Sequence, residues 1–235
     1  MHTHLFPAPA TFFFIISAIT LVQFPVPSVH VVDDDQRYLN CSETFACAGI
    51  SDIGYPFWGS NRPEYCGYPG FELNCSGNLL QLYVADMYYR VLEINSAARS
   101  LKVARVDYWN TTCPSTYDNT TIDRSTLFSH TSATANLKLY YHCPTTSPLL
   151  PTQTAEGFSF NCAEDANGFT NCYSSNSLFA STLLGLCENN VSVPVTEAGT
   201  ITTEDALKEA IDGGFTVGWN ANNNMCNRCD GSGGR

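Results

Sequence analysis

The stretch that decides the fold runs from residue 53 to residue 75. It contains two motifs rich in aromatic and turn-forming residues, IGYPFW at 53–58 and CGYPGFELNC at 66–75. Gly and Pro predict turns here, because Gly permits positive φ and Pro fixes its own φ. Cysteines bound the second motif, in a chain with 11 cysteines among 235 residues. The segment predicts a loop-rich region whose rings either pack as core between disulfides or present their faces to a ligand.

The N-terminus indicates the compartment in which these cysteines are found. The apolar stretch 12–22 has the length of a signal-peptide core and is too short to cross a hydrocarbon layer of about 30 Å. Pro25 and Pro27 end it, and cleavage is expected between Ser28 and Val32. We predict a signal peptide at 1–30, with an uncleaved anchor or a buried helix as the alternative. The mature chain is then secreted or lies on the extracellular face of the plasma membrane, where disulfides persist.

Composition excludes several classes of function. Lys and Arg number 11 against 22 Asp and Glu, giving a net charge of −11, so nucleic acid is not expected as a partner. No GxSxG, HExxH or P-loop pattern occurs, and we predict that the chain is not an enzyme. The pair Cys226 and Cys229 lacks the second pair that zinc requires, so a disulfide is favoured and no metal or cofactor is expected.

The cysteines divide around a Pro-rich segment at 144–157, which predicts a linker. Six precede it and five follow it, so one cysteine should be left unpaired. The predicted disulfide cysteines are Cys41, Cys47, Cys66, Cys75, Cys113, Cys143, Cys162, Cys172, Cys187, Cys226 and Cys229. Spacing alone leaves their pairing open. Five Asn-x-Ser/Thr sequons predict glycosylation at Asn40, Asn74, Asn110, Asn119 and Asn190.

Hydrophobic periodicity predicts mostly β structure. Near period-2 spacing at 80–84, 89–94 and 101–106 indicates three consecutive antiparallel strands, and 137–142 indicates a fourth. One short helix is expected at 203–212, capped by Thr202 and ended by Gly213 and Gly214. The predicted fold is therefore mainly β and disulfide-rich, with two small antiparallel β domains and one short helix in the second.

These motifs together resemble a known family. The spacing Cys41-x5-Cys47, the runs at 53–58 and 66–75, and the patterns at 89–91 and 101–103 resemble the galacturonan-binding extracellular domain of plant wall-associated receptor kinases. The runs VSVPV at 191–195, GGFTVGW at 213–219 and CNRC at 226–229 resemble the Cys-rich C-terminal domain of the same receptors. The leaf-rust-resistance receptor-like kinase branch is the most similar. Ala48 stands where the family often has Gly.

The resemblance implies domain limits and a partner. It implies a galacturonan-binding-like domain at 31–143 and a C-terminal-like domain at 158–235 that is incomplete at its end, because Arg235 precedes an expected cysteine. Membrane association would come only through a missing C-terminal segment, and no Gly-rich loop, HRD or DFG motif of a kinase is present. The expected partner is cell-wall pectin or oligogalacturonide. Because this ligand carries carboxylates, it should bind the less acidic first half of the chain. Ca²⁺ is expected only as a bridge to pectin.

Aromatic and basic side chains of the first half are the candidate ligand-binding residues, because rings can stack on sugars and Arg can pair with a carboxylate. They are Tyr55, Trp58, Arg62, Tyr65, Tyr68, Arg90, Arg99, Lys102 and Arg105. The alternative function is a module or decoy that binds a peptide or co-receptor and no polysaccharide.

Overall fold

The computed structural model of the chain describes residues 29–221 except 152, 155, 164, 166, 167, 176, 197 and 198. Within them, the three consecutive strands predicted from periodicity are present as β4, Leu79–Val84, β5, Met87–Asn95, and β6, Ser100–Arg105. Leu80 and Leu82 of β4 are fully buried while Tyr83 is exposed, which is the alternation that indicated a strand. The predicted fourth strand is β8, Ala135–Pro144.

Other elements complete the described part of the chain. The further strands are β1 Phe45–Cys47, β2 Ile50–Ile53, β3 Leu73–Ser76, β7 Phe128–His130, β9 Gly157–Phe160, β10 Phe169–Ser174, β11 Asn189–Val195 and β12 Phe215–Trp219. The helices are α2 Val29–Ser42, α3 Ser177–Leu186 and α4 Glu204–Asp212, with 3₁₀ turns η1 Glu64–Cys66 and η2 Ile122–Arg124. The fold is thus mainly β and disulfide-rich, as predicted.

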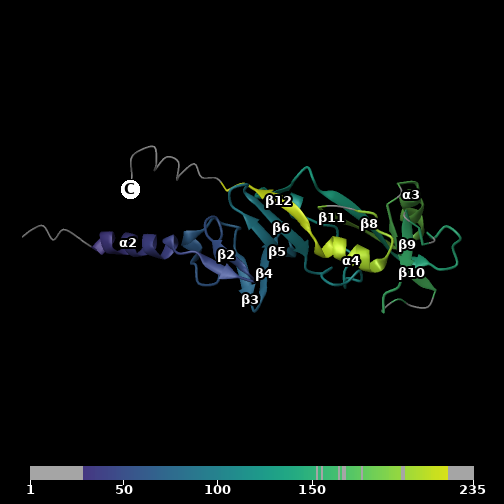
Figure 1. The fold of residues 1–235 in the computed structure, drawn as a ribbon, viewed down its shortest axis with the longest axis horizontal. Coiled ribbons are helices and arrows are strands. Elements are labelled where there is room, and N and C mark those ends of the chain that lie inside the picture. The colour runs from purple at the N-terminus through teal and green to yellow at the C-terminus, as the bar shows by residue number, and fades with distance from the viewer. Residues whose placement is uncertain are drawn as a thin grey trace, which may run out of the picture. The chain divides into compact units, whose positions relative to one another are not determined.

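The largest sheet takes strands from both ends of the sequence. Its order is β3-β4-β5-β6-β12-β7, and every pair is antiparallel. β12 follows α4 far along the chain, yet it pairs with both β6 and β7, and Figure 1 shows it beside β6. Gly214 makes this approach possible: its φ is +66°, and a Cβ there would come within 2.3 Å of the Val103 carbonyl oxygen.

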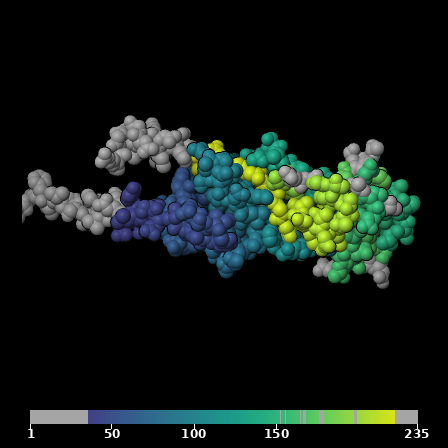
Figure 2. Space-filling model, in the orientation of Figure 1, coloured from purple at the N-terminus to yellow at the C-terminus, as the bar shows by residue number. Residues whose placement is uncertain are grey.

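The second sheet also crosses the predicted linker. Its order is β11-β8-β10-β9, so that β8 from the first half pairs with β10 and β11 from the second. The described residues from Cys41 to Ala221 belong to one compact unit. In the space-filling view, the yellow residues of α4 and β12 share a surface with teal residues from the first half (Figure 2). Each of the two larger sheets therefore contains strands from both predicted halves of the chain.

The helices differ in part from the prediction. α4 occupies the predicted position, but Thr203 caps it instead of Thr202, because the Thr203 Oγ1 accepts a hydrogen bond from the Ala206 N–H at 3.2 Å. α3 packs against β8 and β10 and was not predicted. Its mostly apolar sequence, SLFASTLLGL, gives little amphipathic periodicity. α2 was also not predicted, and the predicted signal peptide lies outside the described residues except for its last two.

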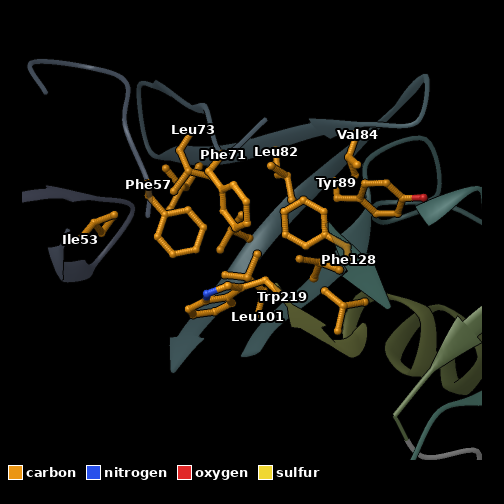
Figure 3. Packing of buried hydrophobic residues seen from close by; sticks show 14 of the residues in the cluster. Ile53, Phe57, Phe71, Leu73, Leu82, Val84, Tyr89, Leu101, Phe128 and Trp219 are labelled. Carbon is orange, nitrogen blue, oxygen red and sulfur yellow. The ribbon is translucent and has the colours of Figure 1, made fainter. Parts of the chain in front are cut away.

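Aromatic side chains dominate the core under the large sheet. Phe57, Phe71 and Phe128 converge with Trp219 beneath β4 to β6 (Figure 3). The Phe57 ring meets Trp219 edge to face at 5.1 Å between centroids and Phe71 at 5.7 Å. The core alternative left open for the IGYPFW motif therefore holds for Phe57, which is 1% exposed. A second core, between the other sheet and α4, includes Leu139, Val193 and Leu207.

Eight cysteines of the described residues form four disulfides. Cys41 bonds to Cys66 and Cys47 to Cys75, fixing both ends of the CGYPGFELNC motif. Two further disulfides, Cys113–Cys162 and Cys143–Cys187, join residues on opposite sides of the predicted linker. Cys226 and Cys229 lie outside the described residues.

Cys172 is the free cysteine of the described part of the chain, and it is fully buried on β10. Burial raises the pKa of its thiol, and the Ser159 hydroxyl, 3.6 Å from the sulfur, opposes this weakly. Since the thiolate is the reactive form, the folded protein protects this cysteine both sterically and electrostatically.

We expect iodoacetamide to leave Cys172 unmodified in the folded protein at pH 8 and to modify it after denaturation without reductant. Burial raises the pKa of this thiol and so disfavours the reactive thiolate, and unfolding removes that protection. Mass spectrometry of the peptide that contains Cys172 separates it from the other cysteines. Modification of this peptide before denaturation would show that β10 is not packed as described.

Candidate ligand-binding site

A small hollow lies at the end of the β5–β6 hairpin. It has a volume of about 170 Å³ and is lined by Tyr55, Pro56, Ser96, Arg99, Trp219 and Ala221. We call it the Arg99 hollow. Tyr55 is 42% exposed, whereas Trp219 reaches into the core and is 7% exposed. Two candidates predicted from the sequence, Tyr55 and Arg99, thus lie together.

Backbone hydrogen bonds fix the position of Arg99. It has a φ of +49° at the end of the hairpin turn, where Asn95 Oδ1 accepts a hydrogen bond from the Ala98 N–H at 2.9 Å. The Arg99 carbonyl accepts a hydrogen bond from the Trp219 N–H at 2.9 Å. β12 therefore holds Arg99 in place and brings the indole of Trp219 beside it.

The Arg99 guanidinium is exposed, and no carboxylate pairs with it within the described ranges. None of the residues that line the Arg99 hollow is acidic. A planar guanidinium beside aromatic rings can bind a carboxylate through two parallel hydrogen bonds while a ring contacts the apolar face of the same ligand.

A second hollow, of about 280 Å³, lies on the outer face of β3 to β5. Its lining residues are Trp58, Gly70, Glu72, Asn74, Gln81, Tyr83 and Tyr88, and we call it the Tyr83 hollow. The rings of Tyr83 and Tyr88 contact each other at 4.7 Å between centroids. Glu72 gives this hollow a negative charge, so it is less suited to an anion than the Arg99 hollow.

Trp58 is positioned by the CGYPGFELNC motif. Its Nε1 donates a hydrogen bond to the Tyr68 carbonyl at 3.1 Å, and its indole packs on the backbone of Gly67. A Cβ on residue 67 would lie 2.4 Å from Trp58 Cδ1, so only glycine permits this contact. Tyr68 itself is half-buried and meets Phe71 edge to face.

Arg62, predicted as a candidate ligand residue, is 6% exposed and has a structural role instead. Its guanidinium donates hydrogen bonds to the carbonyls of Phe57 at 3.1 Å, Cys41 at 2.7 Å, Cys66 at 2.9 Å and Glu43. Desolvation by burial lowers the pKa of Arg62. The cation joins both ends of the Cys41–Cys66 disulfide to the IGYPFW loop.

Arg105 is buried as well, at 1% exposure. It forms a bidentate pair with Asp107, with distances of 3.0 Å from Nε and 2.6 Å from Nη2. Its guanidinium carbon lies 4.7 Å from the centre of the Tyr108 ring. These contacts occupy the charge, so a ligand cannot reach it.

The remaining candidates lie apart from both hollows. Arg90 stacks on Trp109 at 4.0 Å from the ring centre. Tyr65 is 49% exposed on η1. Lys102 lines another hollow, of about 370 Å³, together with Glu209, and its partner across the β5–β6 pair is Glu93. Two acidic neighbours make Lys102 a poor receptor for an anion.

Three aromatic residues of the hollows were not among the candidates predicted from the sequence. Tyr83 and Tyr88 flank the β4–β5 turn at positions that alternate with buried residues, so the period-2 pattern already directed them outward. Trp219 had no such signal, because only the pairing of β12 with β6 brings it to the first half of the chain.

A disulfide-rich β fold with shallow, aromatic-lined hollows is typical of an extracellular recognition module. Residues 41–105 match the family model described as wall-associated receptor kinase galacturonan-binding, and residues 161–235 match the one described as wall-associated receptor kinase C-terminal. The chain therefore carries both of these receptor-kinase domains, which confirms the resemblance found in the sequence.

Receptor kinases of Arabidopsis thaliana are similar to most of the chain. Leaf rust 10 disease-resistance locus receptor-like protein kinase-like 2.1 is 33% identical over 217 residues, covering 86% of this chain and 33% of the relative. The 2.8 protein of the same name is 33% identical over 222 residues, covering 89% and 24%. The chain thus spans a third or less of the length of these two relatives. No solved structure matches.

These similarities identify the chain as extracellular receptor ectodomain sequence. The matched segments contain no kinase domain. Among the helices in the described part of the chain, none combines the length and the apolar character needed to cross a membrane.

We expect Arg62→Ala to lower the free energy of unfolding by about 3 kcal/mol, because four carbonyls lose their charged donor in a buried site. Arg62→Lys should recover little, since an ammonium cannot match the fork of the guanidinium. Urea unfolding with the disulfides intact measures both variants. Arg124→Ala, at an exposed position, is the control and should change stability by less than about 0.5 kcal/mol. Equal stability of Arg62→Ala and the control would contradict the structural role.

Proposed function

We propose that this ectodomain recognises de-esterified galacturonan of the plant cell wall and that the Arg99 hollow binds the uronate. The observation that carries the proposal is the exposed Arg99 guanidinium, which has no acidic partner in the described part of the chain and lies beside Tyr55 and Trp219. The match of residues 41–105 to a galacturonan-binding family model supports the ligand class.

The chemistry of the hollow suits a single uronate. Arg99 offers a bidentate pair to the carboxylate, while the exposed Tyr55 ring offers a face to the C–H groups of the sugar. A volume of about 170 Å³ is below the range of drug-sized pockets, so the hollow takes one sugar residue and leaves the rest of the polymer outside. Several receptors on one polymer would then raise the apparent affinity.

The two hollows differ in local charge, and this decides which of them suits a uronate. The net charge of −11 repels a polyanion at long range, but exposed charges are screened beyond about 8 Å at physiological salt. Local charge then decides, and it favours a uronate at Arg99 over one at the Tyr83 hollow, where Glu72 is present. Ca²⁺ enters the proposal only as a bridge between pectin and carboxylates.

A protein-binding function is the second candidate, and the exposed apolar side chains of α3 favour it. Phe179 is 38% exposed and Leu184 is 55% exposed. Such residues can anchor a peptide or a co-receptor. A decoy that captures a protein and binds no polysaccharide would use this helix, and no ligand would bind in the Arg99 hollow.

Binding of the secreted, glycosylated protein to oligogalacturonides tests the proposal. We expect saturable binding that weakens with salt and with methyl esterification of the same oligomers, because both act on the carboxylate. Arg99→Gln should weaken binding by about 10-fold to 100-fold, the range expected for a hydrogen bond to a charged group. Measurements with and without Ca²⁺ separate direct from bridged binding.

Arg124→Gln is the matched control, since this cation is exposed but lines neither hollow. It should bind like the unaltered protein. Equal binding of esterified and de-esterified oligomers would contradict a uronate site. An equal loss of binding in Arg99→Gln and Arg124→Gln would show that only the overall charge of the protein matters. A folded sample that binds no oligogalacturonide would favour the protein-binding candidate.

A further inference from the structure

The Tyr83 hollow contains a glycosylation sequon in its own wall. Asn74 lines the hollow, and Asn74-Cys75-Ser76 satisfies the Asn-x-Ser rule. Asn74 lies on the exposed face of β3, an edge strand of the large sheet. Its side chain makes no hydrogen bond to any residue that the structure describes, so nothing holds the amide away from the hollow.

The strand register places aromatic rings within reach of that amide. Asn74 lies opposite Gln81, and Leu73 lies opposite Leu82, so Tyr83 is a diagonal neighbour of Asn74 on the same face. Diagonal neighbours in an antiparallel pair are about 7–8 Å apart. Tyr83 is 53% exposed and Tyr88 is 51% exposed, an unusual area of aromatic surface for two adjacent strands.

We propose that Asn74 carries an N-glycan whose first N-acetylglucosamine packs into the Tyr83 hollow, against Tyr83 and Trp58. The hollow is then occupied by the chain's own modification, and the aromatic rings are covered by sugar.

The lining matches this occupant chemically. A pyranose ring presents C–H groups that pack on aromatic faces, and its acetamido and hydroxyl groups can exchange hydrogen bonds with Gln81 and Glu72. The sugar is neutral, so the carboxylate of Glu72, which disfavours a uronate, is a suitable acceptor for its hydroxyl groups. The covalent link supplies a high effective concentration, so weak contacts suffice to hold the ring.

The Tyr83 hollow is rigid on the side that holds the sugar. The Cys47–Cys75 disulfide anchors the residue next to Asn74, and Gly67 fixes Trp58 by close packing. A preorganised surface costs little conformational entropy when the sugar settles on it.

Other sequons lack this setting. The Asn110 amide contacts the Trp109 Nε1 at 2.8 Å and the Asp212 carboxylate at 3.2 Å. The Asn119 Oδ1 accepts a hydrogen bond from the Ser192 N–H at 2.9 Å. Asn190 is exposed on β11 and lines none of the hollows described above. Asn190 therefore offers a matched control.

Thermal unfolding of the secreted protein, produced with high-mannose glycans, tests the proposal after glycopeptide mass spectrometry has measured occupancy at Asn74. Ser76→Ala removes the sequon without altering the hollow and should lower the melting temperature by about 2–4 °C. Endoglycosidase trimming to one N-acetylglucosamine should leave the melting temperature unchanged, because the first sugar makes the contacts. Asn190→Gln should cause a smaller shift.

A double-mutant cycle separates packing from a general effect of glycosylation. In a Tyr83→Ala background, Ser76→Ala should cause a smaller decrease than in the unaltered protein, since one of the two rings that hold the sugar is already gone. In the unaltered protein, the acetyl methyl resonance of the trimmed sugar should be shifted upfield by the rings, and Tyr83→Ala should remove that shift. An unoccupied Asn74, an unchanged melting temperature in Ser76→Ala, or additive losses in the double variant would each overturn the proposal.

Discussion

The antiparallel pairing of β12 with β6 is the constraint on which the rest of the structure depends. It brings a strand from the end of the described chain into the large sheet, between β6 and the edge strand β7. Trp219 thereby enters the core beside Phe57, and its N–H fixes the carbonyl of Arg99. The Arg99 hollow thus takes residues from both receptor-kinase domains, so neither domain alone contains the complete site.

Much of the fold could be predicted from local patterns in the sequence. The strands at 79–105 followed from alternation, and α4 followed from its amphipathic spacing and its ending at Gly213. α3 was missed because its own apolar residues are spread around the helix, which removes the periodic signal. Sharing of strands between the halves was also missed, because a β partner distant in sequence leaves no trace in the local pattern.

The candidate site was predictable in composition but not in arrangement. Residue type directed attention to aromatic and basic side chains, but Arg62 and Arg105 are buried and fully engaged while Arg99 is exposed. Type alone cannot distinguish an arginine that binds carbonyls from one that faces solvent. The difference arises from the Cys41–Cys66 loop, which encloses Arg62, and from the hairpin turn, which projects Arg99 outward.

The two disulfides that link the parts of the chain before and after residues 145–156 affect how the protein withstands proteolysis outside the cell. Cys113–Cys162 and Cys143–Cys187 join covalently the segments that this connection separates. A protease that cut the exposed chain there would leave one nicked molecule, with both sheets paired and the Arg99 hollow intact. The ectodomain can therefore tolerate a broken backbone at this connection and still hold together the parts that form its recognition surface.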